Sequence, residues 1–254
     1  RREFSWPEAC CSRCWPRPAE AAAAAPPPEA AGAKTNPKDM KIVTVVKLVG
    51  VGWFERMRTG VGTYATASGA NATLTGADDA SPEKQVRIIQ DLIAQHPDAI
   101  TVVPNSPQSL EGVLKQAQAA GIKIVTHEAS NQQNTNIDIE AFDNTAYGAH
   151  IMDSLATCMG GSGKYVAFVG HLTAQSHMEW VKGALDQAAA KYPGITRVSD
   201  PIEGLEDTNV VYQKTKELLA KDPTIKGFEG SAGTDVAGIA RAIQEQFSDV
   251  IDCS

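Results

Sequence analysis

The stretch Lys41-Ile-Val-Thr-Val-Val-Lys-Leu-Val-Gly-Val-Gly-Trp-Phe54 decides the fold class of this chain. Its first half is a nearly unbroken run of β-branched residues, which is typical of a strand buried on both faces. Gly50 and Gly52 end the strand, and the apolar spacing after them predicts an amphipathic helix. This order predicts the carboxyl edge of a parallel sheet, where such sheets bind ligands. Lys47, near the strand end, points its amine either into water or into a ligand site.

The alternation of strand and helix continues along the chain. Ser81-Pro82-Glu83 and Ser106-Pro107 place a capping residue before a first-turn proline, and Gly121 suits a helix C-cap. This βαβα order predicts an α/β fold with mostly parallel sheets flanked by helices. The predicted strands are 41–48, 71–76, 99–104, 122–127, 138–142, 164–170, 196–202 and 226–231. The predicted helices are 53–67, 82–95, 108–120, 145–159, 175–191, 207–221 and 235–246.

The domain organisation follows from where this alternation is interrupted. A polar loop precedes Asp138, and we interpret 142–147 as the crossing between an N-terminal lobe, 40–143, and a C-terminal lobe, 144–254. The second lobe is expected to be incomplete, because it has three predicted strands against five in the first. Residues 1–39 contain seven of the fourteen prolines and a run of alanines, which predicts a disordered Pro/Ala-rich segment or a damaged leader.

Composition excludes several classes of protein. The net charge of −7 and the absence of a basic cluster argue against a nucleic-acid partner. No apolar run reaches the ~20 residues of a membrane-spanning helix. Cys11-x-x-Cys14 lacks the second ligand pair of a zinc site, so no metal is predicted. The other cysteines, Cys10, Cys158 and Cys253, form no evident framework, and the fold is expected not to depend on disulfides.

Nucleotide and catalytic motifs fail on their context. Gly50-x-Gly52 lacks the third glycine of a dinucleotide fingerprint, and Gly160-Gly-Ser-Gly-Lys164 precedes a strand where a phosphate loop precedes a helix. His127-Glu128 and the pair His171 and His177 lack the third partner that triad or zinc chemistry requires. The sequence therefore predicts no cofactor and no catalytic residue.

Polar side chains do converge at the predicted carboxyl ends of the strands. With the aromatic pair Trp53-Phe54 nearby, they predict a site for a small hydroxylated ligand, because rings stack on sugar faces and polar groups bind hydroxyls. The strand-end residues are Lys47, Asn105-Ser106, His127-Glu128, 171–177 and 231–235.

Four segments carry a resemblance to a known family. They are Val46-Lys-Leu-Val-Gly-Val-Gly-Trp-Phe54, Ile124-Val-Thr-His-Glu128, Ala141-Phe-Asp-Asn144 and Glu179-Trp-Val-Lys182. Over about 40–246 the chain resembles type I periplasmic binding proteins, above all the autoinducer-2-binding and rhamnose-type sugar-binding members of ABC importers. The resemblance implies two α/β lobes that close over a ligand without catalysing a reaction.

The resemblance also implies where a ligand is held. Lys47 matches the family's lysine, Glu128 stands in place of an aspartate, and Asp235 resembles the aspartate of simple-sugar members. Ser176 and His177 replace an aspartate and a glutamine, and Ser231 and Gly233 replace a proline and an alanine. Because of these departures, a pentose or deoxyhexose is expected nearly as much as autoinducer-2. The expected ligand contacts are Lys47, Trp53, Phe54, Glu128, Ser176, His177, Ser231, Gly233 and Asp235, with a hinge at Asp143 and Asn144.

The function implied is that of a monomeric solute-binding protein, periplasmic or at the cell surface, which delivers autoinducer-2 or a related simple sugar to an ABC transporter permease. Two alternatives stay open at this point. A sensor or regulator with the same fold is disfavoured because residues 1–39 contain no helix-turn-helix pattern. A sugar-metabolising α/β enzyme, such as an isomerase or a dehydrogenase, requires a fingerprint or dyad that the sequence lacks.

Overall fold

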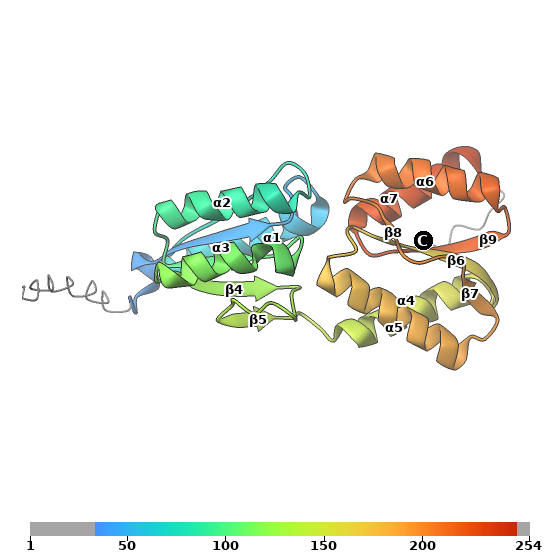
Figure 1. The fold of residues 1–254 in the computed structure, drawn as a ribbon, viewed down its shortest axis with the longest axis horizontal. Coiled ribbons are helices and arrows are strands. Elements are labelled where there is room, and N and C mark those ends of the chain that lie inside the picture. The colour runs from blue at the N-terminus through green and yellow to red at the C-terminus, as the bar shows by residue number, and fades with distance from the viewer. Residues whose placement is uncertain (1–33, 248–254) are drawn as a thin grey trace, which may run out of the picture. The chain divides into compact units, whose positions relative to one another are not determined.

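The computed structural model describes residues 34–247; the segments 1–33 and 248–254 lie outside the described residues. It contains two parallel sheets, each flanked by helices, which confirms the predicted α/β fold class (Figure 1). We call the first sheet with its helices the first lobe and the second sheet with its helices the second lobe. The chain crosses from one to the other at 140–143.

The first lobe is built on five parallel strands in the order β2-β1-β3-β4-β5. Thr44 in β1 lies opposite Leu74 of β2 and Thr101 of β3. The strands are β1 (Lys41–Val46), β2 (Asn71–Gly76), β3 (Ala99–Val102), β4 (Lys123–His127) and β5 (Ile137–Ile139), and the helices are α1 (Gly52–Ser68), α2 (Pro82–Ala94) and α3 (Pro107–Ala119).

The core of the first lobe lies between its sheet and the helices α2 and α3. Both helices begin with a serine whose side chain accepts a hydrogen bond from a backbone N–H of the first turn, followed by proline. Their apolar faces, with Ile89 and Leu114, pack against Val45 and Ile100 of the sheet. Helix α1 buries one side chain among its described residues, Phe54, which packs near the end of β1.

The second lobe is arranged around β6, which has α4 and α5 on one face and α6 and α7 on the other (Figure 1). Strand β9 pairs with one edge of β6, and β7 and β8 pair with successive parts of the other. The elements are α4 (Asn144–Cys158), β6 (Gly163–Val169), α5 (Gln175–Lys191), β7 (Ile195–Arg197), β8 (Ile202–Glu203), α6 (Thr208–Lys221), β9 (Ile225–Gly230) and α7 (Gly233–Gln246).

The single strand predicted at 196–202 is wrong: the structure has β7 and β8, separated by 198–201. Pro201 accounts for the interruption because proline has no N–H for a strand ladder. This division places β8, and the loop that follows it, next to the end of β6, where Val169 pairs with Glu203.

Two further expectations are corrected near the ends of the lobes. Within the segment 1–39, predicted to be disordered, the described part contains the 3-10 helix η1 (Pro37–Asp39), because Asn36 caps it and Pro37 occupies its first position. Lys34 also forms an ion pair with Asp98 at 2.8 Å. Cys158 is disulfide-bonded, so the expectation that this cysteine belongs to no framework is wrong, while the expectation that the fold does not depend on disulfides stays a prediction.

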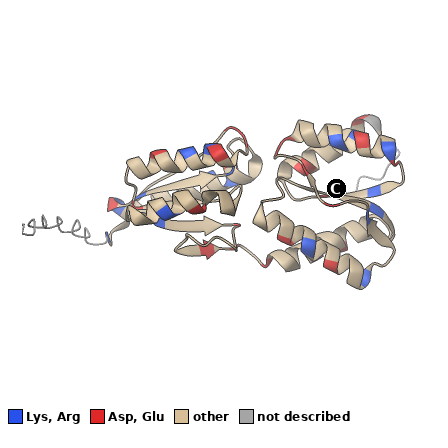
Figure 2. Ribbon diagram, viewed as in Figure 1, with Lys and Arg blue, Asp and Glu red and all other residues tan. Residues whose placement is uncertain are grey.

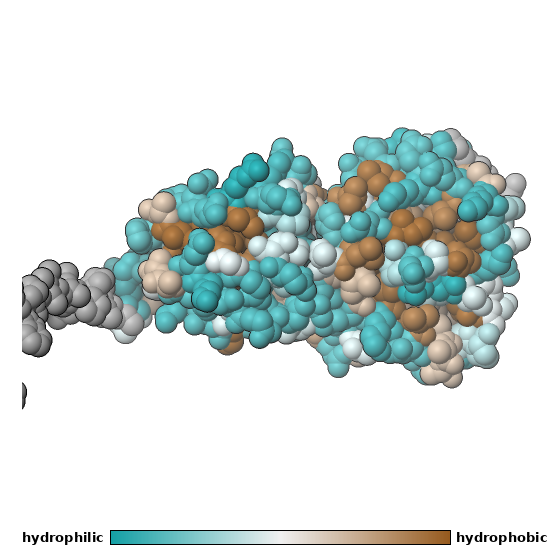
Figure 3. Space-filling model, viewed as in Figure 1, coloured by the Kyte–Doolittle hydropathy of each residue, from teal (hydrophilic) through white to brown (hydrophobic). Residues whose placement is uncertain are grey.

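The surface agrees with the acidic, mixed-charge composition. Figure 2 shows Lys and Arg interspersed with Asp and Glu along the helices, and in that view the basic positions do not gather in one place. In the space-filling view the outer faces of the helices are mostly hydrophilic (Figure 3). Among the described residues, no helix combines the length and the apolar character needed to cross a membrane.

Candidate functional site

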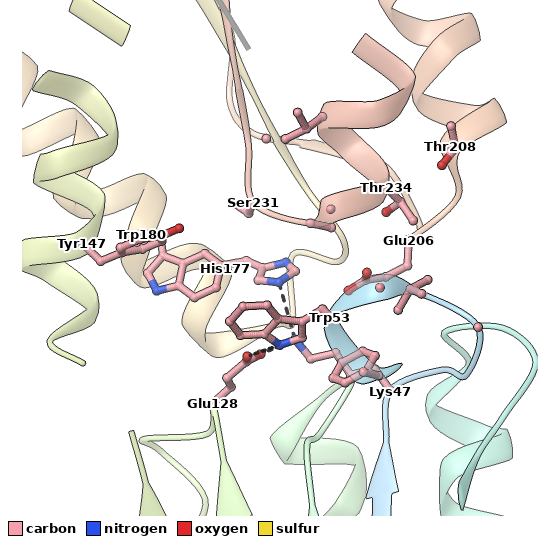
Figure 4. Close-up of a pocket in the computed structure, with 18 of the residues that line it drawn as sticks. Lys47, Trp53, Glu128, Tyr147, His177, Trp180, Glu206, Thr208, Ser231 and Thr234 are labelled. Atoms are coloured by element: carbon pink, nitrogen blue, oxygen red, sulfur yellow. Dashed lines mark hydrogen bonds and ion pairs between the residues drawn. The ribbon is translucent and has the colours of Figure 1, made fainter. Parts of the chain in front are cut away.

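A cavity of about 600 Å³ lies where loops from both lobes meet. Lys47 and Glu128 follow β1 and β4 of the first lobe, and Glu206 and Ser231 follow β8 and β9 of the second. Because parallel strands present their carboxyl ends at one edge of each sheet, these loops converge around one volume. Figure 4 shows their side chains around this cavity.

Lys47 and Glu128 form a buried ion pair in the cavity wall. Lys47 Nζ donates to Glu128 Oε2 at 2.9 Å, and the two side chains are 2% and 5% exposed. Burial disfavours the ammonium, but Glu128, together with Glu206 and Glu140, outweighs this cost and the pKa of Lys47 is raised. Burial also opposes the Glu128 carboxylate, yet Lys47 lowers its pKa to about 2. Both groups are therefore charged at neutral pH, and they neutralise each other.

Glu128 also receives hydrogen bonds from elements of both lobes. Trp53 Nε1, at the start of α1, donates to Oε1 at 3.1 Å (Figure 4). Ser176 Oγ, in the first turn of α5, donates to Oε2 at 3.4 Å. The carboxylate is thereby fixed by the ammonium, the indole and the hydroxyl.

His177 presents a hydrogen-bond donor to the cavity. Its Nδ1 accepts from the backbone N–H of Gly170 at 3.1 Å. Burial, and then the Lys47 ammonium, lowers the pKa of His177 well below 6.5, so the ring is neutral and its proton resides on Nε2. Nε2 lies 3.5 Å from Lys47 Nζ, which is itself only a donor. Two donors cannot satisfy each other, and the pair suits an acceptor oxygen placed between them.

Aromatic rings form one wall of the cavity. Phe142 and Tyr147 have ring centroids 4.6 Å apart, and Tyr147 and Trp180 are 5.2 Å apart. Trp180 is held in place because its Nε1 donates to Asn144 Oδ1 at 2.8 Å. With Trp53 and Phe54, these rings offer apolar faces to a flat ligand.

The second lobe adds hydroxyl groups that have no partner. Ser231 follows β9 and Thr234 lies in the first turn of α7, and both line the cavity. Their Oγ and Oγ1 atoms are buried and make no hydrogen bond with the described residues. A buried hydroxyl without a partner is costly, so these atoms are suited to bind a ligand or water.

The two acidic residues in the cavity wall both adopt an unusual backbone conformation. Glu128 has φ of 59° and Glu206 has φ of 53°, in the left-handed region that non-glycine residues rarely adopt. Such conformations cluster at functional sites, where the surrounding structure enforces them.

The structure brings seven of the nine expected ligand contacts to the cavity wall. These are Lys47, Trp53, Phe54, Glu128, His177, Ser231 and Gly233. Ser176 is fully buried and reaches the site only through Glu128.

Asp235, the ninth expected contact, is buried beneath the start of α7 instead of lining the cavity. Its Oδ2 accepts from the backbone N–H of Ala232 at 2.9 Å, so the carboxylate caps the helix. A β-carbon at Gly204 would lie 2.3 Å from its Oδ1. Burial raises the pKa of Asp235 to about 7.

The two residues expected at the hinge lie at the start of α4, directly after the crossing. Asp143 Oδ1 accepts from Ala146 N–H at 2.9 Å and caps the helix. Asn144 Nδ2 donates to Glu179 Oε2 at 2.7 Å, and Ser130 of the first lobe donates to Glu179 Oε1 at 2.6 Å. These bonds connect the crossing to α5, while a hinge motion stays a prediction.

Several cavity residues were missed by sequence reasoning. Tyr147 and Trp180 lie in helices, where an aromatic residue is usually part of the core. The position of Trp180, one helical turn after His177, was a signal that could have identified it. Glu206 was missed because the sequence did not separate β8 from β7, and the end of β8 was therefore misplaced. Beyond the nine expected ligand contacts, the cavity is lined by two residues of the predicted strand-end segment 231–235, Ala232 and Thr234. The other residues that the structure adds are Gly50, Val51, Gly52, Phe142, Tyr147, Trp180, Glu206, Thr208, Gly230 and Val236.

No metal centre is evident between residues 34 and 247: none of their His, Cys, Asp and Glu side chains form a group of three or more suited to an ion. Among the described residues that line the cavity, no hydroxyl is hydrogen-bonded to a histidine or a carboxylate: Ser231 and Thr234 have no partner, and Ser176, which donates to Glu128, does not line the cavity. The arrangement is suited to hydrogen bonding and stacking.

Comparison with known proteins gives a consistent result. The sequence profile of the periplasmic binding protein domain matches residues 42–251. The xylitol-binding protein of Mycolicibacterium smegmatis is 27% identical over 188 residues, which cover 74% of this chain and 53% of that protein. The chain thus spans about half the length of this curated relative.

Solved structures share the fold. An ABC transporter solute-binding protein from Agrobacterium vitis, bound to alpha-D-tagatopyranose, has a TM-score of 0.74 and 27% identity, covering 81% of this chain and 72% of that one. LsrB from Clostridium saccharobutylicum, in complex with AI-2, has a TM-score of 0.77 and 19% identity, covering 82% and 67%.

Proposed function

This chain belongs to the periplasmic binding protein family, and on that premise we propose that its cavity captures a neutral sugar or sugar alcohol for an ABC importer. The observation that carries the proposal is the pairing of an aromatic wall with polar atoms that have no partner. Ser231 and Thr234 supply unpaired hydroxyls, and Tyr147 and Trp180 supply ring faces. A sugar ring presents hydroxyls at its edge and apolar C–H groups on its faces, so it satisfies both.

Two donors, one from each lobe, favour a ligand oxygen at one place. Lys47 Nζ and His177 Nε2 both require an acceptor, and a ring oxygen, carbonyl or hydroxyl of a sugar supplies one. Autoinducer-2 and simple pentoses or deoxyhexoses all carry such oxygens. The replacement of family aspartates by Glu128 and Ser176 favours a simple sugar over autoinducer-2.

The wider setting is part of the same proposal. A captured sugar is delivered by a monomeric binding protein to the permease of an ABC transporter, in the periplasm or at the cell surface. The tagatose-bound and xylitol-binding relatives support this assignment through their similarity to the chain.

Thermal melting with a ligand panel tests the proposal. The panel contains xylitol, D-ribose, D-arabinose, D-tagatose, L-rhamnose and autoinducer-2. A ligand that binds only the folded state stabilises it by about 2.7 kcal/mol at a hundredfold excess over its Kd. We expect at least one neutral sugar or sugar alcohol to raise the midpoint of a cooperative melt, with titration calorimetry giving the Kd.

The proposal fails if the melt is cooperative and no panel member shifts it at millimolar concentration. Chemical turnover of a bound sugar would replace it with the enzyme alternative. Tight duplex DNA binding at low salt would replace it with the regulator alternative.

A further inference from the structure

We propose that Glu206 selects ligands by their charge: the cavity binds neutral or cationic polyhydroxylated molecules and rejects anionic ones such as sugar acids. This inference rests on the proposed function, because it assumes that a sugar occupies the cavity. Figure 4 shows Glu206 on the second-lobe side of the site, close to Thr234 and Thr208.

The carboxyl group of Glu206 lines the cavity without a partner. Glu128, the other acid there, has bonds from Lys47, Trp53 and Ser176. No hydrogen bond or ion pair joins the Glu206 side chain to any residue of the described chain. Two carboxyl oxygens without donors suit a ligand that supplies donors, such as two hydroxyls or an ammonium.

The surrounding backbone holds this carboxyl in place. Leu205, like Glu206, has left-handed backbone, and its N–H donates to Gly170 O at 2.9 Å. A β-carbon at Gly170 would lie 2.5 Å from Glu206 Oε1, so the carboxyl occupies space that only glycine leaves open. The same Gly170 orients His177 through its N–H. One glycine thus positions groups on both sides of the ligand volume.

The balance of charge supplies the specificity. Among the described residues that line the cavity, Lys47 is the one lysine or arginine, and Glu128 already neutralises it. The charged or titratable groups that act on Glu206 are Lys47, Glu128, His171 and, from α7, Asp235. Burial raises the pKa of Glu206, and the Lys47 ammonium offsets this effect only in part. An anionic ligand would add a second uncompensated charge, whereas a cationic one would supply the counter-ion.

Matched ligand pairs test the inference by titration calorimetry. The pairs are D-ribose with D-ribonate, D-xylose with D-xylonate, and D-galactose with D-galacturonate, with D-galactosamine as the cationic probe. The measured quantity is the ratio of Kd for the acid to Kd for its neutral partner. We expect this ratio to exceed about thirtyfold in the unmodified chain. In Glu206→Gln it should fall by about tenfold or more, because the gain or loss of one hydrogen bond to a charged group changes Kd by about this factor.

Glu203→Gln is the matched control, because it removes a carboxylate three residues away that does not line the cavity. Its side chain accepts from Leu172 N–H, which glutamine can also do. The ratio should stay unchanged in this variant. If Glu206→Gln does not melt cooperatively, Gly170→Ala displaces the carboxyl and Glu206→Asp shortens it, and each should lower the affinity for the neutral sugar.

The outcomes separate the two proposals. If no neutral sugar binds, the proposed function fails, and the role of Glu206 fails with it. If a neutral sugar binds but its acid binds equally well, or Glu206→Gln leaves the ratio unchanged, only the role of Glu206 is overturned.

Discussion

Lys47 and Glu128 depend on each other, because both side chains are buried and the ammonium lies 2.9 Å from the carboxylate. Taking a charge out of water is costly, and the pair offsets that cost by direct contact. Two apolar side chains of similar volume would pack here as well, but only the charge pair places an ammonium at the cavity wall.

Replacing one partner should therefore cost more than replacing both. Lys47→Met leaves Glu128 buried without its counter-ion, and we expect the free energy of unfolding to fall by about 3–5 kcal/mol. Lys47→Met/Glu128→Gln should recover most of that loss in urea denaturation. Both variants should bind the cognate sugar at least about tenfold more weakly, because the ammonium is gone. This role of the pair would be contradicted if the losses in unfolding free energy of the two single variants simply added in the double variant, or if Kd stayed unchanged.

Part of the site was predictable from the sequence at the scale of single residues. Lys47, Glu128 and His177 follow strands or begin helices at positions that the β-branched runs and caps identify locally. Glu206 was not predictable in this way, because its position depends on a two-residue strand after Pro201. The displacement of Asp235 from the cavity depends on the fit to Gly204, which only the folded backbone reveals.

At the scale of elements, the helices α4 and α5 meet through two glycines. A β-carbon at Gly148 would lie 2.0 Å from the backbone oxygen of Trp180, and one at Gly183 would lie 2.3 Å from that of Thr145. Backbone atoms cannot move aside as a flexible side chain can. This close crossing sets where Tyr147 of α4 and Trp180 of α5 stand in the cavity.

Gly183→Ala should push α4 and α5 apart although residue 183 does not line the cavity. We expect a loss of about 1–3 kcal/mol in unfolding free energy, as for other overpacked contacts, together with weaker sugar binding. Gly112→Ala in α3 is the control, because a β-carbon there meets nothing within 4 Å. It should stabilise the protein by about 0.5–1 kcal/mol, since alanine favours a helix interior. Equal effects of the two substitutions would contradict the packing argument.

The element boundaries themselves were largely predictable. The helix expected at 82–95 is observed at Pro82–Ala94, because serine caps and first-turn prolines act within one turn of chain. The split between β7 and β8 was missed because Pro201 is compatible with an extended backbone, so the sequence around it still predicts one continuous strand. The glycine contact between α4 and α5 joins residues 32 positions or more apart, and no local pattern encodes it.

At the scale of the whole molecule, stability should depend on pH through buried carboxyls. Glu229 lies in β9, is 2% exposed, and neither of its carboxyl oxygens has a hydrogen-bond partner among residues 34–247. Burial raises the pKa of Glu229 to about 8 and that of Asp235 to about 7. At these two carboxyls the folded state therefore holds more protons than the unfolded state between about pH 4 and 8, so their contribution to stability falls as pH rises through this window. His177, whose pKa is lowered, opposes them below about pH 6.5. Glu128, with its lowered pKa, acts oppositely below about pH 4.5.

We expect the melting temperature to be higher at pH 5 than at pH 8.5. Glu229→Gln should stabilise the protein by about 2–4 kcal/mol at pH 8.5 and change it little at pH 5, since each pKa unit corresponds to about 1.4 kcal/mol. Glu217→Gln, on the exposed side of α6, is the control for net charge. Equal shifts for both variants at both pH values would show that Glu229 is not the cause.

Trp53 and Trp180 are two of the four tryptophans of the chain, and both line the cavity. The intrinsic tryptophan fluorescence of the protein therefore comes partly from the cavity. Trp53 is 53% exposed, and a ligand that displaces water from its indole should move the emission to shorter wavelengths. Replacing Trp6 and Trp15 with phenylalanine would leave the cavity pair as the only tryptophans. If the proposed function holds, their fluorescence would then report sugar binding without an attached label.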